Sequence, residues 1–152
     1  MPSPEDRELP GGGLGYALNH AAHLWRSELA SALSEVSVTT PQFFVLAALL
    51  HAQRSARRMR QRDAAEHAGT DANTASQVVR LLEHRGLVLR QVDPDDSRAR
   101  VLALTQAGHE LAVLCTGRAR ALNREFFSGV EAPPLHEALR TLSVKARERR
   151  AN

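Results

Sequence analysis

The sequence predicts a mainly α-helical protein with one small β-hairpin. Apolar residues recur at three- and four-residue steps through most of the 152-residue chain, which is the spacing of helices with one buried face. Aromatic residues make up only 4% of the chain, too few for a typical β-sandwich. Two short apolar runs, 87–92 and 98–104, flank the turn-forming segment 93–97 and predict the hairpin. Because 43% of the residues are hydrophobic, we expect one compact unit.

The first third of the chain predicts a loose arm followed by two helices. Residues 1–13 are polar, contain prolines and end in three glycines, so we expect a flexible arm. Thr40 and Pro41 predict the N-cap and first residue of the second helix, whose body, 43–50, is apolar on all sides and therefore central to the core. The first helix carries one apolar stripe: Leu14, Leu18, Ala21, Trp25, Leu29, Leu33 and Val36.

The formal net charge of +3 arises in the middle of the chain. Ten arginines and seven acidic residues lie between positions 54 and 100, whereas ten basic and ten acidic residues balance elsewhere. Five of these arginines fall within 54–62, a predicted solvated connection. Two interpretations of this run stay open: its arginines position phosphates, or they only keep the chain soluble.

Two helices and the hairpin then follow in the order of a winged helix-turn-helix. The first helix, 61–67, stops at Gly69, and the second begins after an N-cap at Thr70 or Asp71 and ends near Arg85. The inward stripe of the second helix is Ala75, Val78, Val79 and Leu82. Its outward residues are mostly short hydrogen-bonding types, suited to base edges in a DNA major groove: Asn73, Thr74, Ser76, Gln77 and Arg80.

The hairpin supplies candidate contacts to the neighbouring minor groove. Arg98 is the main candidate, because the negative potential there attracts arginine, and we expect the Asp96 carboxylate to hold its guanidinium. Arg100 completes the predicted DNA-contacting set. The alternative is that the outward helix face is merely solvated and that Arg98 only forms a salt bridge within the hairpin.

The last third of the chain predicts two more helices. Thr105 caps the first, and a second follows Gly129, Pro133 and Pro134 and ends in the basic run 147–150. The first has a stripe of Ala107, Leu111, Cys115, Ala119, Leu122 and Phe126, and the second has Leu135, Leu139 and Leu142. These stripes are longer than a lone lobe can bury, so residues 14–38 and 105–152 are expected to form a dimerisation region around a winged lobe at 39–104.

Two segments resemble the MarR family of bacterial transcription regulators. VTTPQFFVLAAL at 38–49 is similar to the family's helix after the dimerisation helix, and LLEHRGLVLRQVDPDDSRARVLALTQAGHEL at 81–111 is similar to its recognition helix end, wing and following helix. The sequence departs from the family pattern at three positions. Ser97 stands where the family often has arginine. Arg60 stands where a Ser or Thr cap commonly begins the first helix of the motif, and Ala64 stands where leucine is usual.

The resemblance implies a homodimeric regulator of transcription that binds a palindromic operator in double-stranded DNA. A cytoplasmic location is expected from the residues, because the start of the sequence lacks the basic then apolar pattern of a signal peptide and the single cysteine fits a reducing compartment. It also implies a repressor released by a small aromatic or phenolic effector, bound between the first helix and the winged lobe. We expect His23, Trp25, Arg26 and Phe44 near that site, although packing alone also explains the aromatic residues.

Three other functions fit the sequence less well than regulation by DNA binding. Cys115, the single cysteine, allows a redox switch, but its place in an apolar stripe favours a buried side chain. An enzyme such as a cysteine hydrolase is disfavoured because no triad spacing is recognisable. A winged helix that binds protein instead of DNA is expected to show apolar anchors where 73–80 is polar. No cofactor, metal site or membrane span is expected; His20 and His23 lack a further ligand at suitable spacing.

Overall fold

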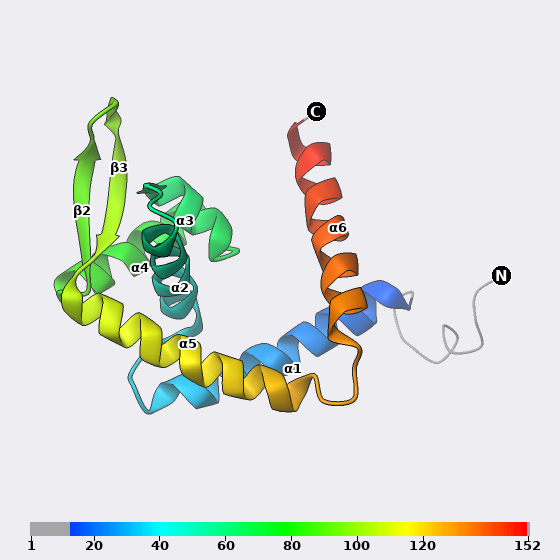
Figure 1. Cartoon of the computed structure of the whole chain (residues 1–152). Coiled ribbons are helices and arrows are strands. Elements are labelled where there is room, and N and C mark those ends of the chain that lie inside the picture. Colours follow the sequence, from blue (N-terminus) through cyan, green and yellow to red (C-terminus); the bar gives the residue numbers. More distant parts are fainter. Residues whose placement is uncertain (1–12, 152) are drawn as a thin grey trace.

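The computed structural model describes residues 13–151, and this range contains six helices and one small sheet (Figure 1). The helices are α1 (Leu14–Ser34), α2 (Thr40–Arg54), α3 (Gln61–His67), α4 (Ala72–His84), α5 (Gln106–Phe126) and α6 (Ala132–Ala151). The strands are β1 (Met59–Arg60), β2 (Val88–Asp93) and β3 (Asp96–Leu104). The mainly helical class with a hairpin wing is therefore confirmed. The arm predicted at 1–13 lies outside the described residues except for Gly13.

The core surrounds α2, as its apolar sequence predicts. Val45 and Leu46 of this helix are fully buried, and α1 contributes Leu29 and Leu33 to the same cluster. The inward stripe of α4 is also buried, since Ala75, Val78, Val79 and Leu82 are each less than 10% exposed. Burial of these side chains fixes α4 on the body of the lobe and leaves its opposite face to solvent.

A third strand was not predicted. The segment between α2 and α3 contains β1, which pairs with β3 through Met59 opposite Leu102 and Arg60 opposite Val101, so that the strand order is β1-β3-β2. Met59 is buried, although its neighbours in the arginine run are more exposed. A two-residue strand is too short to show the alternation by which strands are recognised, so the segment was interpreted as a solvated connection.

The wing hairpin is longer and less regular than predicted. Strand β2 continues to Asp93 and β3 begins at Asp96, which leaves only residues 94 and 95 as the turn. Regular pairing ends at Val92 opposite Arg100, and the next pair is Asp93 opposite Asp96. Residues 97–99 of β3 therefore lie outside the ladder, and they form a bulge near the tip of the wing.

Two details of the helices differ from the sequence prediction. The N-cap of α2 is Thr39, which forms a capping box with Gln42, and Pro41 lies one position later in the helix than expected. In α5 the buried residues at the start are Gly108 and Ala112, whereas the predicted Ala107 is exposed and the predicted Leu111 is partly buried against the core. The later members of the predicted stripe, Cys115 and Ala119, are buried as expected.

Gly108 faces inward because the backbone of the wing base lies against it. A Cβ atom at this position would stand 1.9 Å from the carbonyl oxygen of Leu87. Thr105 stabilises the same junction: its hydroxyl donates to the carbonyl of Gly86 at 2.7 Å, and its backbone N–H donates to that of Leu87 at 3.1 Å. The only side chain that fits at 108 is thus hydrogen, so the first turn of α5 rotates to bring this glycine to the inside.

The N-terminal part of α1 and the whole of α6 expose apolar side chains. Leu14 is 84% and Leu142 is 53% exposed, and none of residues 132–151 is buried. An ion pair between Arg147 and Glu66, 3.0 Å apart, connects α6 to α3. Figure 1 shows α6 continuing from the end of α5 at a sharp angle. No helix in the described range has both the length and the apolar composition needed to cross a membrane.

Candidate nucleic-acid interface

Helix α4 begins at an acidic cap. Asp71 accepts hydrogen bonds from the backbone N–H groups of Asn73 and Thr74 at 2.9 and 3.0 Å, and from the Thr74 hydroxyl at 2.7 Å. These bonds, with the Thr74 hydroxyl first among them, hold the pKa of the Asp71 carboxyl below its ordinary value. The cap satisfies donors at the start of the helix and fixes the first exposed residues of α4 in space.

The polar face of α4 lies opposite its buried stripe. Asn73, Gln77 and Arg80 are exposed, whereas Thr74 and Ser76 are partly covered. Because the Thr74 hydroxyl donates to Asp71, it can act toward a partner only as an acceptor, beside its methyl group. The five residues predicted from the sequence therefore lie on one side of this helix, and three of them are exposed to solvent.

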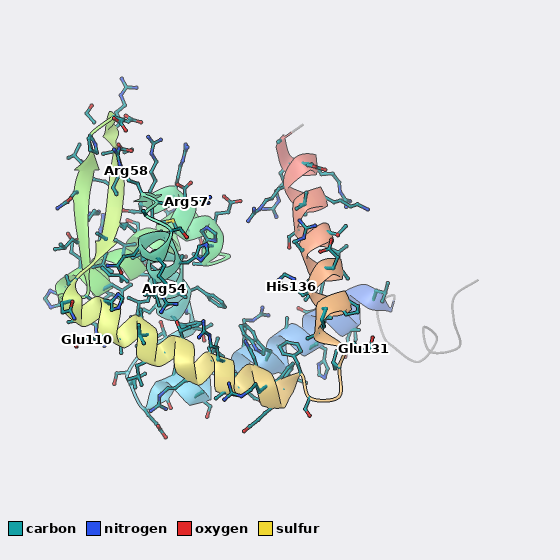
Figure 2. All side chains as sticks on the ribbon, viewed as in Figure 1. Arg54, Arg57, Arg58, Glu110, Glu131 and His136 are labelled. Carbon is teal, nitrogen blue, oxygen red and sulfur yellow. The ribbon has the colours of Figure 1, made fainter. Side chains whose placement is uncertain are left out.

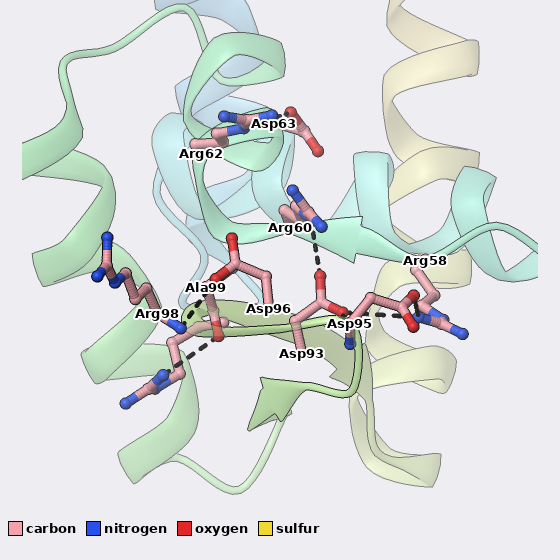
Figure 3. Close-up of polar contacts among 10 residues, drawn as sticks. Arg58, Arg60, Arg62, Asp63, Asp93, Asp95, Asp96, Arg98 and Ala99 are labelled. Atoms are coloured by element: carbon pink, nitrogen blue, oxygen red, sulfur yellow. Dashed lines mark hydrogen bonds and ion pairs between the residues drawn. The ribbon is translucent and has the colours of Figure 1, made fainter.

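The wing residues are exposed but are not paired as expected. Asp96 accepts a hydrogen bond from the backbone N–H of Arg98 at 3.0 Å, and no ion pair in the described range joins its carboxylate to the Arg98 guanidinium (Figure 3). The prediction that Asp96 holds this guanidinium is thus wrong, because the bulge turns the backbone of Arg98 toward the carboxylate. Arg100 instead donates to the carbonyls of Ser97 and Ala99, both at 3.2 Å, and so closes the bulge.

A groove of about 550 Å³ separates α3 and the start of α4 from the wing. Its charged lining comprises five arginines and one carboxylate. Three of these arginines pair with carboxylates outside the lining, so the excess of positive charge comes from Arg98 and Arg100 on the wing. Such a groove attracts phosphates and releases their counterions on binding. The lining residues are Arg60, Gln61, Arg62, Ala65, Ala72, Ala75, Arg90, Asp96, Arg98, Ala99 and Arg100.

Two arginines of the 54–62 run form ion pairs with the wing, although the Arg58 side chain stays largely exposed. Arg60 Nε donates to Asp93 Oδ2 at 2.7 Å, and the Arg58 guanidinium pairs with Asp95 (Figure 3). Asp93 was not among the predicted site residues. The backbone N–H of Asp95 first, and then Arg60, hold the pKa of this buried carboxyl below its ordinary value. Sequence reasoning missed these pairs because their partners lie more than thirty positions apart.

The other arginines near the end of α2, Arg54 and Arg57, do not line the wing groove. Figure 2 labels Arg54 and Arg57 at the C-terminal end of α2 and just after it, with Arg58 closer to the wing. Arg57 and Arg58 also line a smaller cavity of about 220 Å³ between α2 and β3. The arginine run is therefore divided among several environments, and it does not form one uniform phosphate-binding surface.

Comparisons with known proteins agree with this geometry. A model of the MarR family matches residues 36–99, which include α2, the helix-turn-helix and most of the wing. A transcriptional regulator of that family from Rhodococcus sp. RHA1 has a similar structure, with a TM-score of 0.74, 27% identity and coverage of 88% of this chain and 91% of that one. The chain is thus similar to the MarR family in sequence and in fold. Members of this family are regulators of transcription and not enzymes.

Two further relatives of this chain are informative. The HTH-type transcriptional repressor Rv2887 of Mycobacterium tuberculosis is 29% identical over 129 residues, which cover 85% of this chain and 90% of the relative. The structure of CouR from Rhodococcus jostii RHA1, bound to p-coumaroyl-CoA, has a TM-score of 0.73 and 25% identity, covering 88% of this chain and 91% of CouR. The first is a named repressor, and the second holds a phenolic thioester.

The residues predicted for an effector site are only partly brought together. Trp25 and Phe44 are partly buried, with their ring centroids 6.0 Å apart, and Trp25 Nε1 donates to Asn123 Oδ1 at 2.9 Å. His23 and Arg26 are exposed on α1. These residues line neither the wing groove nor the cavity beside β3. The aromatic pair therefore lies where α1, α2 and α5 meet, in contact with the core.

The environment of Cys115 is unsuited to a reactive thiol. The side chain is fully buried in α5, and burial raises its pKa, against the smaller opposing effects of Arg118 and Arg85. Oxidation requires thiolate character and access, and this site provides little of either. Within residues 13–151, no group of three or more His, Cys, Asp or Glu side chains is placed to hold a metal ion.

Proposed function

We propose that this chain is a MarR-type regulator that binds double-stranded DNA with α4 in the major groove and the wing in the adjacent minor groove. The observation that carries the proposal is the exposed polar face of α4, which begins beside the arginine-lined groove of the wing. Asn73, Gln77 and Arg80 offer donors and acceptors of the kinds that pair with adenine and guanine edges. Thr74, Ser76, Asp96, Arg98 and Arg100 complete the proposed contact set.

The proposed active form is a homodimer on a palindromic operator. We assign residues 39–104 to the DNA-binding lobe and residues 14–38 and 105–152 to the dimerisation region. The exposed apolar residues on α1 and α6 support this division, because a second copy would cover them. Two copies of α4 related by a two-fold axis would read half-sites about one helical turn apart, which a single helix cannot do.

We further propose that the regulator is a repressor and that a small aromatic or phenolic ligand releases it from DNA. The name of the mycobacterial relative supports repression, and the p-coumaroyl-CoA bound to CouR supports the ligand class. The candidate site is the junction of Trp25 and Phe44 with the exposed side chains of His23 and Arg26. Trp25 is the only tryptophan, so quenching of its fluorescence and release of DNA should occur together when such a ligand binds.

Selection of DNA by the purified protein tests the proposal. We expect recovery of a palindromic duplex that is bound far more tightly than random sequence, with an affinity that falls steeply with salt. The Gln77→Ala variant should lose about 1–3 kcal/mol on that duplex while retaining its affinity for random DNA. His51→Ala, an exposed change on α2 outside the wing groove, is the control and should leave both unchanged. Equal losses on both DNAs for Gln77→Ala would contradict base reading by α4.

A further inference from the structure

The buried carboxylate of Asp93 joins two strands that are not neighbours in the sheet. Strand β3 lies between β1 and β2, yet Arg60 of β1 donates to Asp93 of β2 at 2.7 Å. Asp93 is only 3% exposed, and its second oxygen accepts the backbone N–H of Asp95 at 2.9 Å, with an Arg58 nitrogen 3.6 Å away. A buried charge requires such partners, so Asp93 is fully committed to this contact.

This contact lies where the regular pairing of the wing fails. Beyond Val92 opposite Arg100, residues 97–99 form the bulge, so the ladder no longer fixes the direction of the tip. Arg60 is also the residue directly before α3, and its side chain makes no bond that caps that helix. The ion pair therefore connects the tip of the wing to the start of the helix-turn-helix, across the middle strand.

We propose that Arg60 and Asp93 are positioning residues that set the direction of the wing, and hence the place where Arg98 meets DNA. The inference rests on the proposed DNA-binding function. It implies that an acidic residue, Asp93, strengthens binding to DNA, although DNA is itself negatively charged. Removal of a carboxylate near DNA ordinarily strengthens binding, because repulsion of the phosphates is lost. If Asp93 orients the wing, its removal weakens binding instead, so the two explanations predict opposite signs.

The test compares Asp93→Asn with a matched control, Asp63→Asn. Asp63 lies on α3 and faces Arg62 at 3.6 Å, outside the contact with the wing. On the duplex recovered by selection, we expect Asp93→Asn to bind about five- to tenfold more weakly than the wild type, near the lower limit for loss of one groove contact. Asp63→Asn should bind as tightly as the wild type or more tightly. If Asp93→Asn lowers the thermal midpoint too far for a binding measurement, Arg60→Gln should lose more affinity than Arg62→Gln, which removes another arginine of the groove outside the contact with Asp93.

The double variant Asp93→Asn/Arg98→Ala shows whether the effect passes through the wing. If Asp93 acts by orienting Arg98, the double variant should bind within about twofold of Arg98→Ala alone. Fully additive losses, or an Asp93→Asn protein that binds as tightly as the wild type, would overturn the proposal.

A measurement without DNA separates this inference from the proposed function. Amide hydrogen exchange in the wing, residues 95–100, should be faster in free Asp93→Asn and Arg60→Gln than in the wild type and in Asp63→Asn. Unchanged exchange would overturn the positioning role whether or not DNA binds. A wild-type protein with no preference for any duplex would overturn the DNA-binding function alone.

Discussion

The winged lobe and the helices that flank it differ in how much apolar surface each buries for itself. In the lobe, Val45, Leu46, Val79 and Leu82 are completely buried, and the residues left outside on α4 are mainly polar. In α6 no residue from 132 to 151 is buried, and leucines remain exposed along it. The lobe therefore shares one buried core with Leu29 and Leu33 of α1 and with Cys115 of α5, whereas α6 has the composition of one half of an interface.

A cavity in the lobe core should have the largest effect on stability. Leu46→Ala removes a fully buried side chain at the centre of α2, and we expect the free energy of unfolding to fall by about 2–5 kcal/mol. Urea denaturation at a fixed protein concentration measures the change. Leu81→Ala, at a 55% exposed position on α4, is the control and should stay within about 0.5 kcal/mol of the wild type. Similar losses for both variants would show that the lobe core is not the stabilising element.

A charge on α6 should affect assembly rather than folding of the lobe. Leu142→Asp places a carboxylate on the exposed apolar side of α6, and we expect the dimer dissociation constant to rise about a hundredfold because an unpaired charge is costly to bury. Light scattering over a range of micromolar concentrations measures the mass. Leu89→Asp, at a similarly exposed position on β2, is the matched control and should remain dimeric. A wild-type protein with the mass of one chain would contradict the proposed dimer and the role of α6 in it.

The smallest expected effect is a loss of folding stability at low pH, when the Asp71 carboxylate that caps α4 is protonated. Hydrogen bonds keep the pKa of Asp71 below its ordinary value of 3.8 in the folded protein. The stability that this carboxylate provides is therefore complete above pH 3.8 and is lost as the pH falls through the lower folded value. Asn caps helices about as well as Asp but does not titrate, so Asp71→Asn should lose less stability than the wild type below about pH 4. Thermal midpoints at pH 5 and near pH 3 test this, and equal decreases in the two proteins would exclude the cap as their source.

The sequence was sufficient for features that depend on local periodicity. The step of three to four residues in α4 correctly separated its buried stripe from its polar face, and Gln61–His67 was predicted with the observed bounds. The completely apolar run in α2 correctly indicated a helix at the centre of the core. These features are determined by the order of residues within one element, so no information about distant parts of the chain was needed.

Features that depend on distant partners were missed or misplaced. The strand at Met59 exists because β3 pairs with it, and Asp93 is buried because Arg60 reaches it across the sheet. The inward turn of Gly108 depends on the carbonyl of Leu87. In each case the deciding contact spans twenty or more positions, and a pattern within a single window does not contain it. The positions of the DNA-contacting residues themselves remain predictions.

The close contact between Gly108 and Leu87 also has a mechanical consequence. With a carbonyl oxygen filling the space where a Cβ would stand, and with both Thr105 hydrogen bonds closing the same turn, the start of α5 has almost no freedom to pivot against the base of the wing. A rotation of α5 should therefore move β2, β3 and the end of α4 with it. Any flexible joint that changes the separation of two α4 helices in a dimer must lie elsewhere along the chain.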